Sequence, residues 1–269
     1  MKKSFEYQTG EISYLDVGTG FPVVLIHGFG EDRHIWNTQI NFLNKYCQLI
    51  VPDLPGSGKS AAPKADWSIE KYAESMKALL NHENIAQCIM LGHSMGGYIT
   101  LAFIDLFPEM VRAFGLLHST AFEDGVEKKQ NRLKGIEIMK EYGAFHFLKS
   151  TTPNLFGKSF KTSFPEKVQG LIDQGIHFTK ESLENYYKAI RERPNRRYVL
   201  QNCRLPVLFI MGDEDAAAPL NDLLQQVYLP EISYIHILKG VGHMGMWEAE
   251  KQFNNYVLRF IEEAGNISG

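Results

Sequence analysis

Short apolar runs rich in branched side chains alternate with amphipathic stretches at both ends of the chain. Strands are expected over residues 12–17, 23–27, 49–52, 89–91, 114–117, 207–211 and 234–238, and helices over 69–80, 97–107, 220–228 and 247–263. Several of the apolar runs do not alternate with polar residues, as expected where helices cover both faces of a sheet. The pattern predicts an α/β fold with a mostly parallel central sheet flanked by helices.

Residues 121–200 interrupt this alternation, because the segment contains no convincing strand. A gap of this length between two sheet strands is too long for an ordinary loop. We therefore expect a helical cap, or lid, inserted between two late strands, with residues 1–120 and 201–269 forming the core domain. The cap carries 15 Lys or Arg residues against 10 Asp or Glu residues, which is a weak indication of anionic substrates.

The overall composition is that of a globular protein, with 269 residues, 44% of them hydrophobic, and a formal net charge of -3. No apolar run approaches the roughly 18 residues of a membrane span, and the amino terminus lacks the apolar stretch of a secretory signal. Cys47, Cys88 and Cys203 show no CxxC spacing, which favours reduced thiols over disulfides. A cytoplasmic location is expected.

The stretch LGHSMGG at residues 91–97 places Ser94 between an apolar strand and an amphipathic helix. Such a tight turn strains the serine backbone and brings chain segments so close that only small residues fit at Gly92 and Gly96. The hydroxyl then lies at the positive end of a helix, where developing negative charge is stabilised. This G-x-S-x-G pattern is typical of a nucleophile elbow. The alternative is a glycine-rich turn without chemistry.

A serine nucleophile needs a general base, and the base needs an orienting partner. Of the nine histidines, His243 follows the last expected strand, at the sheet edge where ligands of open α/β sheets bind. His118 is the nearest rival, because it also follows a strand, but nothing nearby in the sequence orients it. Among three acids after the strand at 207–211, Asp215 lies far enough along to reach the final loop. Asp213 is expected to cap the turn.

Acyl transfer also needs hydrogen-bond donors for the oxyanion. The first expected donor is the backbone N–H of Met95, directly after the nucleophile. The second is the N–H of Phe29, in the glycine-rich loop HGFG at residues 27–30.

Five motifs follow one another along the chain: HGFG at 27–30, DLPGSGKS at 53–60, GHSMGG at 92–97, GDED at 212–215 and GHMGMWE at 242–248. In these motifs the chain resembles the α/β-hydrolase superfamily, in the lidded branch that includes small serine esterases. The resemblance implies a triad of Ser94, Asp215 and His243, with Phe29 and Met95 as oxyanion donors beneath a helical cap. It does not imply a substrate, because proteins of this fold differ widely in chemistry.

Other classes of site find little support. The stretch GSGKS at 56–60 lacks the first glycine of a phosphate-binding P-loop, where the chain has Asp53. The histidines show no compact ligand spacing, so we expect no metal and no cofactor. A basic cluster at residues 191–197 is interpreted as a solvated face, and no nucleic acid partner is expected.

The leading hypothesis is a cofactor-independent serine hydrolase that acts on a small-molecule ester or related carbonyl compound through an acyl-enzyme. The same machinery also suits a C–C bond hydrolase, a lactonase or a perhydrolase. A receptor that binds small molecules with little turnover is an alternative of a different class. Serine at position 94 disfavours dehalogenases and epoxide hydrolases, which use an aspartate there in similar folds. No feature of the sequence indicates an oligomeric state.

Overall fold

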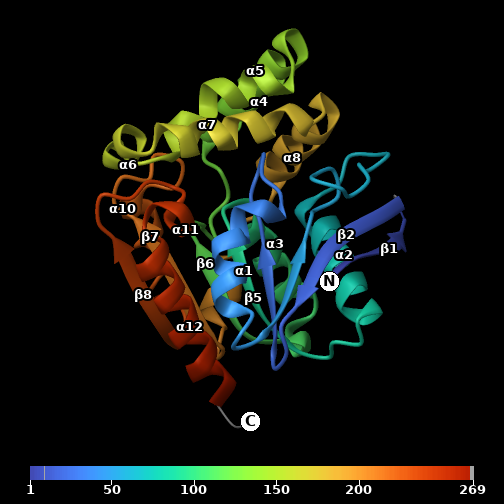
Figure 1. Ribbon diagram of the computed structural model, residues 1–269, viewed down its shortest axis with the longest axis vertical. Helices are drawn as coiled ribbons and strands as arrows, with labels where there is room; N and C mark the ends of the chain where they lie inside the picture. Colours follow the sequence, from blue (N-terminus) through green and yellow to red (C-terminus); the bar gives the residue numbers. More distant parts are fainter. Residues whose placement is uncertain (9, 267–269) are drawn as a thin grey trace.

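A central sheet of eight strands organises the protein (Figure 1). The computed structural model describes residues 1–8 and 10–266. Its strands are β1 (Lys2–Tyr7), β2 (Gly10–Val17), β3 (Pro22–Ile26), β4 (Gln48–Pro52), β5 (Cys88–His93), β6 (Val111–Leu117), β7 (Pro206–Gly212) and β8 (Ile232–Leu238). The strand order is β1-β2-β4-β3-β5-β6-β7-β8, and all neighbours pair parallel except β1 with β2 and β2 with β4. The prediction of a mostly parallel sheet is confirmed.

Helices cover both faces of the sheet, which explains why its central strands read as continuous apolar runs. On one face lie α1 (Asn37–Leu43), α11 (Gly245–Glu248) and α12 (Glu250–Asn266), which contact one another over a core that includes Trp36 and Phe253. On the other face α2 (Ile69–His82) packs against α3 (Met95–Leu106) over a core that includes Tyr72 and Phe103. The short α10 (Leu220–Leu223) lies between β7 and β8 in the chain.

A helical layer separates β6 from β7 in the chain and covers one end of the sheet (Figure 1). It consists of α4 (Val126–Tyr142), α5 (Ala144–Thr151), α6 (Lys158–Ser163), α7 (Pro165–Gln174) and α8 (Lys180–Glu192). The short α9 (Arg197–Gln201) follows and contacts α3. We call residues 121–200 the helical insertion. All of them lie in the described part of the chain and none forms a strand, as expected from the sequence.

Several element boundaries differ from the sequence prediction. The edge strand β1 was not predicted, because its sequence KKSFEY has one buried residue, Phe5, and no apolar run. The helix expected at 220–228 ends at Leu223, since the chain turns there and lets the buried Gln226 side chain bind the backbone of Ser119 and Ala121. The helix expected at 247–263 is interrupted at Ala249.

Candidate active site

Ser94 occupies the tightest turn of the sheet. β5 ends at His93 and α3 begins at Met95, so a single residue forms the connection, fewer than the sequence suggested. Ser94 has a φ of 51° and a ψ of -116°, a conformation that L-residues adopt only at a cost. A Cβ atom at Gly92 would lie 2.2 Å from the carbonyl oxygen of Gly96, so a larger side chain has no room there. The predicted strain and close approach are confirmed.

The turn lies where the strand order reverses. The strand that follows β3 in the chain, β4, lies on one side of β3. The next strand, β5, lies on the other side of β3, and the later strands extend the sheet from there. Ligands of open α/β sheets bind at the carboxyl ends of strands at such a switch point. The loop of residues 27–30 follows β3, and Ser94 follows β5. Both elements therefore border the same crevice.

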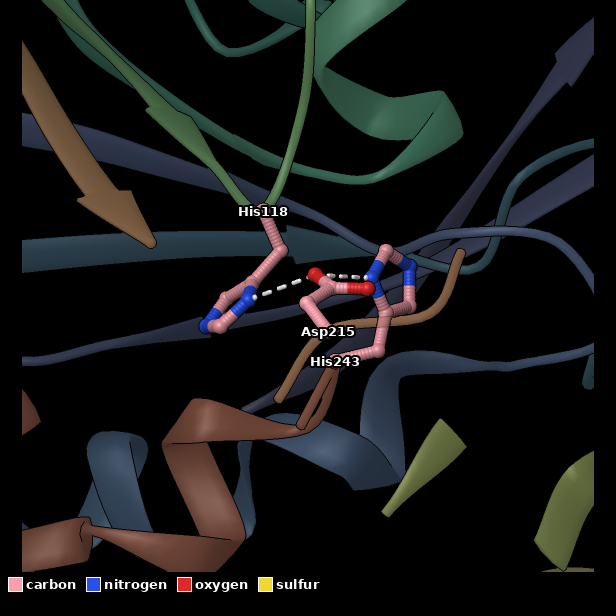
Figure 2. Close-up of side chains that lie close together, drawn as sticks. All are labelled: His118, Asp215 and His243. Carbon is pink, nitrogen blue, oxygen red and sulfur yellow. Dashed lines mark hydrogen bonds and ion pairs between the residues drawn. The ribbon is translucent and has the colours of Figure 1, made fainter. Parts of the chain in front are cut away.

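Asp215 holds the ring of His243 through a hydrogen bond between two loops. The Nδ1 atom of His243 lies 2.7 Å from Oδ2 of Asp215, and both side chains are buried (Figure 2). The other oxygen, Oδ1, accepts hydrogen bonds from the backbone N–H groups of Ala217 at 2.9 Å and Ala218 at 2.8 Å. Because Nδ1 is engaged with a carboxylate, Nε2 is the ring nitrogen left to accept a proton. His243 and Ser94 line the same cavity.

A second histidine shares the Asp215 carboxylate. Nδ1 of His118 lies 3.0 Å from Oδ2, and Figure 2 shows the His118 and His243 rings on opposite sides of the carboxyl group. His118 is fully buried, has a φ of 51°, and does not line the cavity that contains Ser94. The expectation that nothing orients His118 was wrong, because Asp215 orients it. Its position still excludes it as the base for Ser94.

The charges of this cluster stabilise one another. Burial alone would raise the pKa of Asp215, but the imidazoles of His243 and His118 hold it far below its usual range. Burial opposes protonation of His243, yet the Asp215 carboxylate outweighs this effect and raises its pKa above 6.5. Burial lowers the pKa of His118 to about 4, so its ring is neutral near pH 7. An ionised Asp215 thus binds the rings of both His243 and His118, which differ in their pKa.

The two expected oxyanion donors lie on either side of the crevice. Met95 is the first residue of α3, and the N–H groups of the first turn of a helix have no partner within the helix. Among the described residues neither the Met95 N–H nor the Phe29 N–H donates a hydrogen bond to the protein. A Cβ atom at Gly28 would lie 3.1 Å from Cβ of Ser94, so the loop before Phe29 approaches the serine closely.

A buried pair that sequence reasoning missed supports this loop. Glu31 Oε2 accepts a hydrogen bond from the N–H of Gly28 at 2.6 Å and lies 3.0 Å from Nδ1 of His93. The opposite nitrogen of His93 lies 2.9 Å from the carbonyl oxygen of His243. Glu31 and His93 therefore connect the loop after β3 to the loop that carries His243. The position of His93 directly before the nucleophile was the available signal.

The cavity at Ser94 is small and is closed by the helical insertion. Its volume is about 120 Å³. The core lines it with Phe29, Ser94, Tyr98 and His243, among others, and the insertion contributes as many residues as the core: Arg132, Leu148, Thr151, Thr152, Leu155, Leu171, Tyr187 and Ile190. A neighbouring cavity of about 380 Å³ shares Tyr98 and Arg132 with it. The sequence did not indicate which residues of the insertion line the cavity.

Two other motifs have structural roles. Asp53, in the segment DLPGSGKS, is buried and accepts hydrogen bonds from the Arg33 side chain and from the N–H of Lys59 at 3.0 Å. Asp213 accepts a hydrogen bond from the N–H of Gly240 at 2.6 Å, which ties the end of β7 to the turn after β8. Both carboxylates stabilise loops that border the sheet edge.

His118, Asp215 and His243 also form a compact group of metal-ligating atoms, which lie within 4.8 Å of one another. A metal ion would need a free lone pair on the ring nitrogens that face Asp215. The hydrogen bonds of this cluster instead place a proton on each of these nitrogens. We therefore assign the three side chains to a hydrogen-bond network. None of the helices in the described part of the chain has the length and apolar character needed to span a membrane.

Comparison with known proteins places this geometry in a family. Residues 22–250 match the family model described as alpha/beta hydrolase fold, and the chain belongs to this family. A thermophilic esterase from Thermogutta terrifontis, in a malate-bound structure, superposes with a TM-score of 0.92 at 25% identity, over 98% of this chain and 99% of the esterase.

Two relatives that are similar in sequence have names that describe different activities. The chain is 25% identical over 271 residues to 2-hydroxy-6-oxo-6-(2'-aminophenyl)hexa-2,4-dienoic acid hydrolase from Metapseudomonas resinovorans, covering 96% of this chain and 90% of that enzyme. It is 28% identical over 246 residues to the dihydrolipoyllysine-residue acetyltransferase component of the acetoin cleaving system from Pseudomonas putida. That match covers 91% of this chain but 64% of the relative, so the chain spans less than two thirds of its length.

Proposed function

We propose that the protein is a cofactor-independent serine hydrolase of small carboxylic esters. One observation carries the proposal: the Asp215–His243 hydrogen bond borders the same cavity as a serine held in a strained turn. A nucleophile, a base and an orienting acid are the three components that acyl transfer requires. The core, residues 1–120 and 201–269, supplies all three, and the insertion at 121–200 acts as the cap.

The mechanism follows from the position of each group. Oγ of Ser94 attacks the ester carbonyl while Nε2 of His243 accepts its proton, and Asp215 stabilises the resulting imidazolium. The N–H groups of Phe29 and Met95 receive the oxyanion of the tetrahedral intermediate. His243 then protonates the departing alcohol and activates the water that releases the acyl group.

The size of the cavity favours short acyl chains. Sites for drug-sized ligands have volumes of roughly 300–1,000 Å³, whereas the cavity at Ser94 has about 120 Å³. The similarity to the Thermogutta terrifontis esterase supports ester hydrolysis as the reaction.

Hydrolysis of a C–C bond is the second candidate. The observation that favours it is the similarity over 96% of the chain to a hydrolase of a 2-hydroxy-6-oxo dienoic acid. That reaction also divides a molecule next to a carbonyl group, and the proposed triad suits both substrates. Comparing an ester with a vinylogous 1,5-diketo acid as substrate would separate the two activities.

Substitution of the nucleophile tests the proposal. Ser94→Ala should lower hydrolysis of p-nitrophenyl acetate and butyrate by about 10⁴-fold or more, because the attacking oxygen is lost. Ser163→Ala, at an exposed residue at the end of α6, is the matched control and should retain wild-type rates.

A fluorophosphonate probe gives a second measurement, because it labels activated serines. Labelling should occur in the wild type and in Ser163→Ala and disappear in Ser94→Ala. Labelling that persists in Ser94→Ala would refute the assignment of the nucleophile. A wild-type protein that is neither labelled nor active would favour a binding protein.

A further inference from the structure

A single cationic side chain enters the cavity at Ser94 from the helical insertion. Among the described residues that line this cavity, Arg132 is the one Lys or Arg. It lies on α4 and also borders the neighbouring larger cavity. Its side chain is 23% exposed, so its charge is only partly hydrated. The proposed nucleophile and a partly buried guanidinium therefore face one small space.

The charges around Arg132 do not cancel. Nε of Arg132 donates a hydrogen bond to Oδ2 of Asp124 at 2.9 Å, and a terminal nitrogen of Arg193 donates to Oδ1 of the same carboxylate at 2.9 Å. Two guanidinium groups thus share one carboxylate, and one positive charge is in excess. This excess is costly in a partly buried site unless an anion compensates it.

The excess charge is available at Arg132 rather than at Arg193. Arg193 also donates hydrogen bonds to the carbonyl oxygens of Ile190 and Phe122, and its guanidinium lies 3.9 Å from the centre of the Tyr98 ring. Arg132 donates no hydrogen bond to a backbone carbonyl among the described residues, and its guanidinium lies 4.8 Å from the centre of the Tyr187 ring.

An arginine carries five N–H groups in a planar fork. Among the described residues, Nε of Arg132 donates its hydrogen bond to Asp124, and the guanidinium lies against the Tyr187 ring. The terminal N–H groups of Arg132 are therefore left for a ligand.

Other charges nearby do not oppose an anion at this position. Glu31 lines the cavity, but Gly28 and His93 already engage its carboxylate. The acids of the larger cavity, Glu123, Glu127 and Asp222, are exposed to solvent, where water and salt screen them. Two of these acids also have cationic partners, since Lys129 pairs with Glu123 and Lys128 with Asp222.

We propose that the physiological ester carries a carboxylate that Arg132 binds, and that the substrates are half-esters of short dicarboxylic acids. A carboxylate accepts two N–H groups of a guanidinium in a bidentate pair, which fixes position as well as charge. The ester carbonyl at the opposite end of such a short acid would then be presented to Ser94. This inference rests on the proposed ester hydrolysis and adds the substrate class.

A pair of near-isosteric esters tests the inference. Monomethyl succinate carries a carboxylate where methyl levulinate carries a neutral acetyl group, and methanol release measures the hydrolysis of both. The wild type should have the higher kcat/KM for monomethyl succinate. Arg132→Gln should lower that value roughly ten- to hundredfold, mainly through KM, because a charge-assisted hydrogen-bond pair is lost. Hydrolysis of methyl levulinate should change less than about threefold, and Arg132→Lys should restore part of the loss.

Arg191→Gln is the matched control, because Arg191 lines neither cavity and pairs with Glu192 on the surface. If Arg132→Gln lowers kcat/KM for both esters equally, or if the wild type has the higher kcat/KM for methyl levulinate, the inference is wrong. The proposal of ester hydrolysis would still stand. If the wild type hydrolyses neither ester nor p-nitrophenyl acetate and Ser94 takes up no fluorophosphonate, the proposed function itself fails.

Inhibition of the wild type gives an answer that does not depend on the folding of any variant. Succinate should inhibit hydrolysis of p-nitrophenyl acetate competitively, and at least tenfold more strongly than succinamide, its neutral analogue. Equal inhibition by the two compounds would overturn the inference.

Discussion

Replacement of Asp215 by asparagine should remove catalysis while leaving the fold intact. Oδ1 of Asp215 accepts two backbone N–H groups, so the amide oxygen of the introduced asparagine is expected to take this position. The amide nitrogen then replaces Oδ2 and donates toward Nδ1 of both His243 and His118. Each ring must accept at Nδ1 and carry its proton on Nε2.

The consequences differ between the two rings. His118 tolerates the change, because its Nε2 atom has no hydrogen-bond partner among the described residues in either state. His243 loses the free Nε2 lone pair that accepts the proton of Ser94. The wrong tautomer of a triad histidine lowers kcat by about 10⁴-fold, which corresponds to about 5 kcal/mol of transition-state stabilisation.

Steady-state hydrolysis of p-nitrophenyl butyrate measures this loss, and circular dichroism verifies the fold of Asp215→Asn. Asp213→Asn is the matched control, because an amide oxygen can still accept the hydrogen bond from Gly240. Folded Asp215→Asn with kcat within tenfold of the wild type would refute the role of Asp215 and the tautomer argument together.

Three further predictions concern protonation and packing. Since Asp215 raises the pKa of His243, kcat/KM should fall as the pH decreases through a midpoint above about 6.5, and a midpoint at or below that value would contradict the assignment. His118→Ala should move this midpoint upward, because Oδ2 of Asp215 then binds the His243 proton alone; a purely structural His118 would lower only the melting temperature. Gly96→Ala should cost about 1–3 kcal/mol or more in urea unfolding, because its Cβ would lie 2.4 Å from a carbonyl oxygen of β3. Gly125→Ala, with no atom within 4 Å of the added Cβ, should stay within about 1 kcal/mol of the wild type.

The fold was largely predictable because its main signals are local. The buried strands β3, β5 and β7 read as apolar runs, and each was predicted to within two residues at either end. The strand β1 was missed because an edge strand buries few side chains. Its stability comes from pairing with β2, which is a tertiary contact and leaves no apolar pattern in the sequence.

The candidate site was predictable only in part, for a similar reason. Glycines around Ser94 and the loop positions of Asp215 and His243 are visible in the sequence. The contact of His118 with Asp215 joins residues 97 positions apart and depends on β6 and β7 being neighbours in the sheet. Arg132 reaches the cavity from a helix whose orientation the sequence pattern does not define.

The helical insertion is attached to the loop that carries His243, and under the proposed function this attachment restricts how a substrate can enter. The backbone N–H of His243 donates a hydrogen bond to the carbonyl oxygen of Leu155 at 2.6 Å. Glu248 accepts hydrogen bonds from the N–H of Gly157 at 2.7 Å and from that of Gly242 at 3.0 Å, so one carboxylate holds the insertion and the loop together.

Opening the insertion on this side would break these bonds and displace the imidazole that Ser94 needs. We therefore expect substrate entry elsewhere, and the neighbouring cavity of about 380 Å³, which shares Arg132 with the site, is the candidate route. An anionic substrate taking this route would meet Arg132 before it reaches Ser94. The same arginine would thus select the substrate and orient it, while the anchored side of the insertion keeps His243 in place.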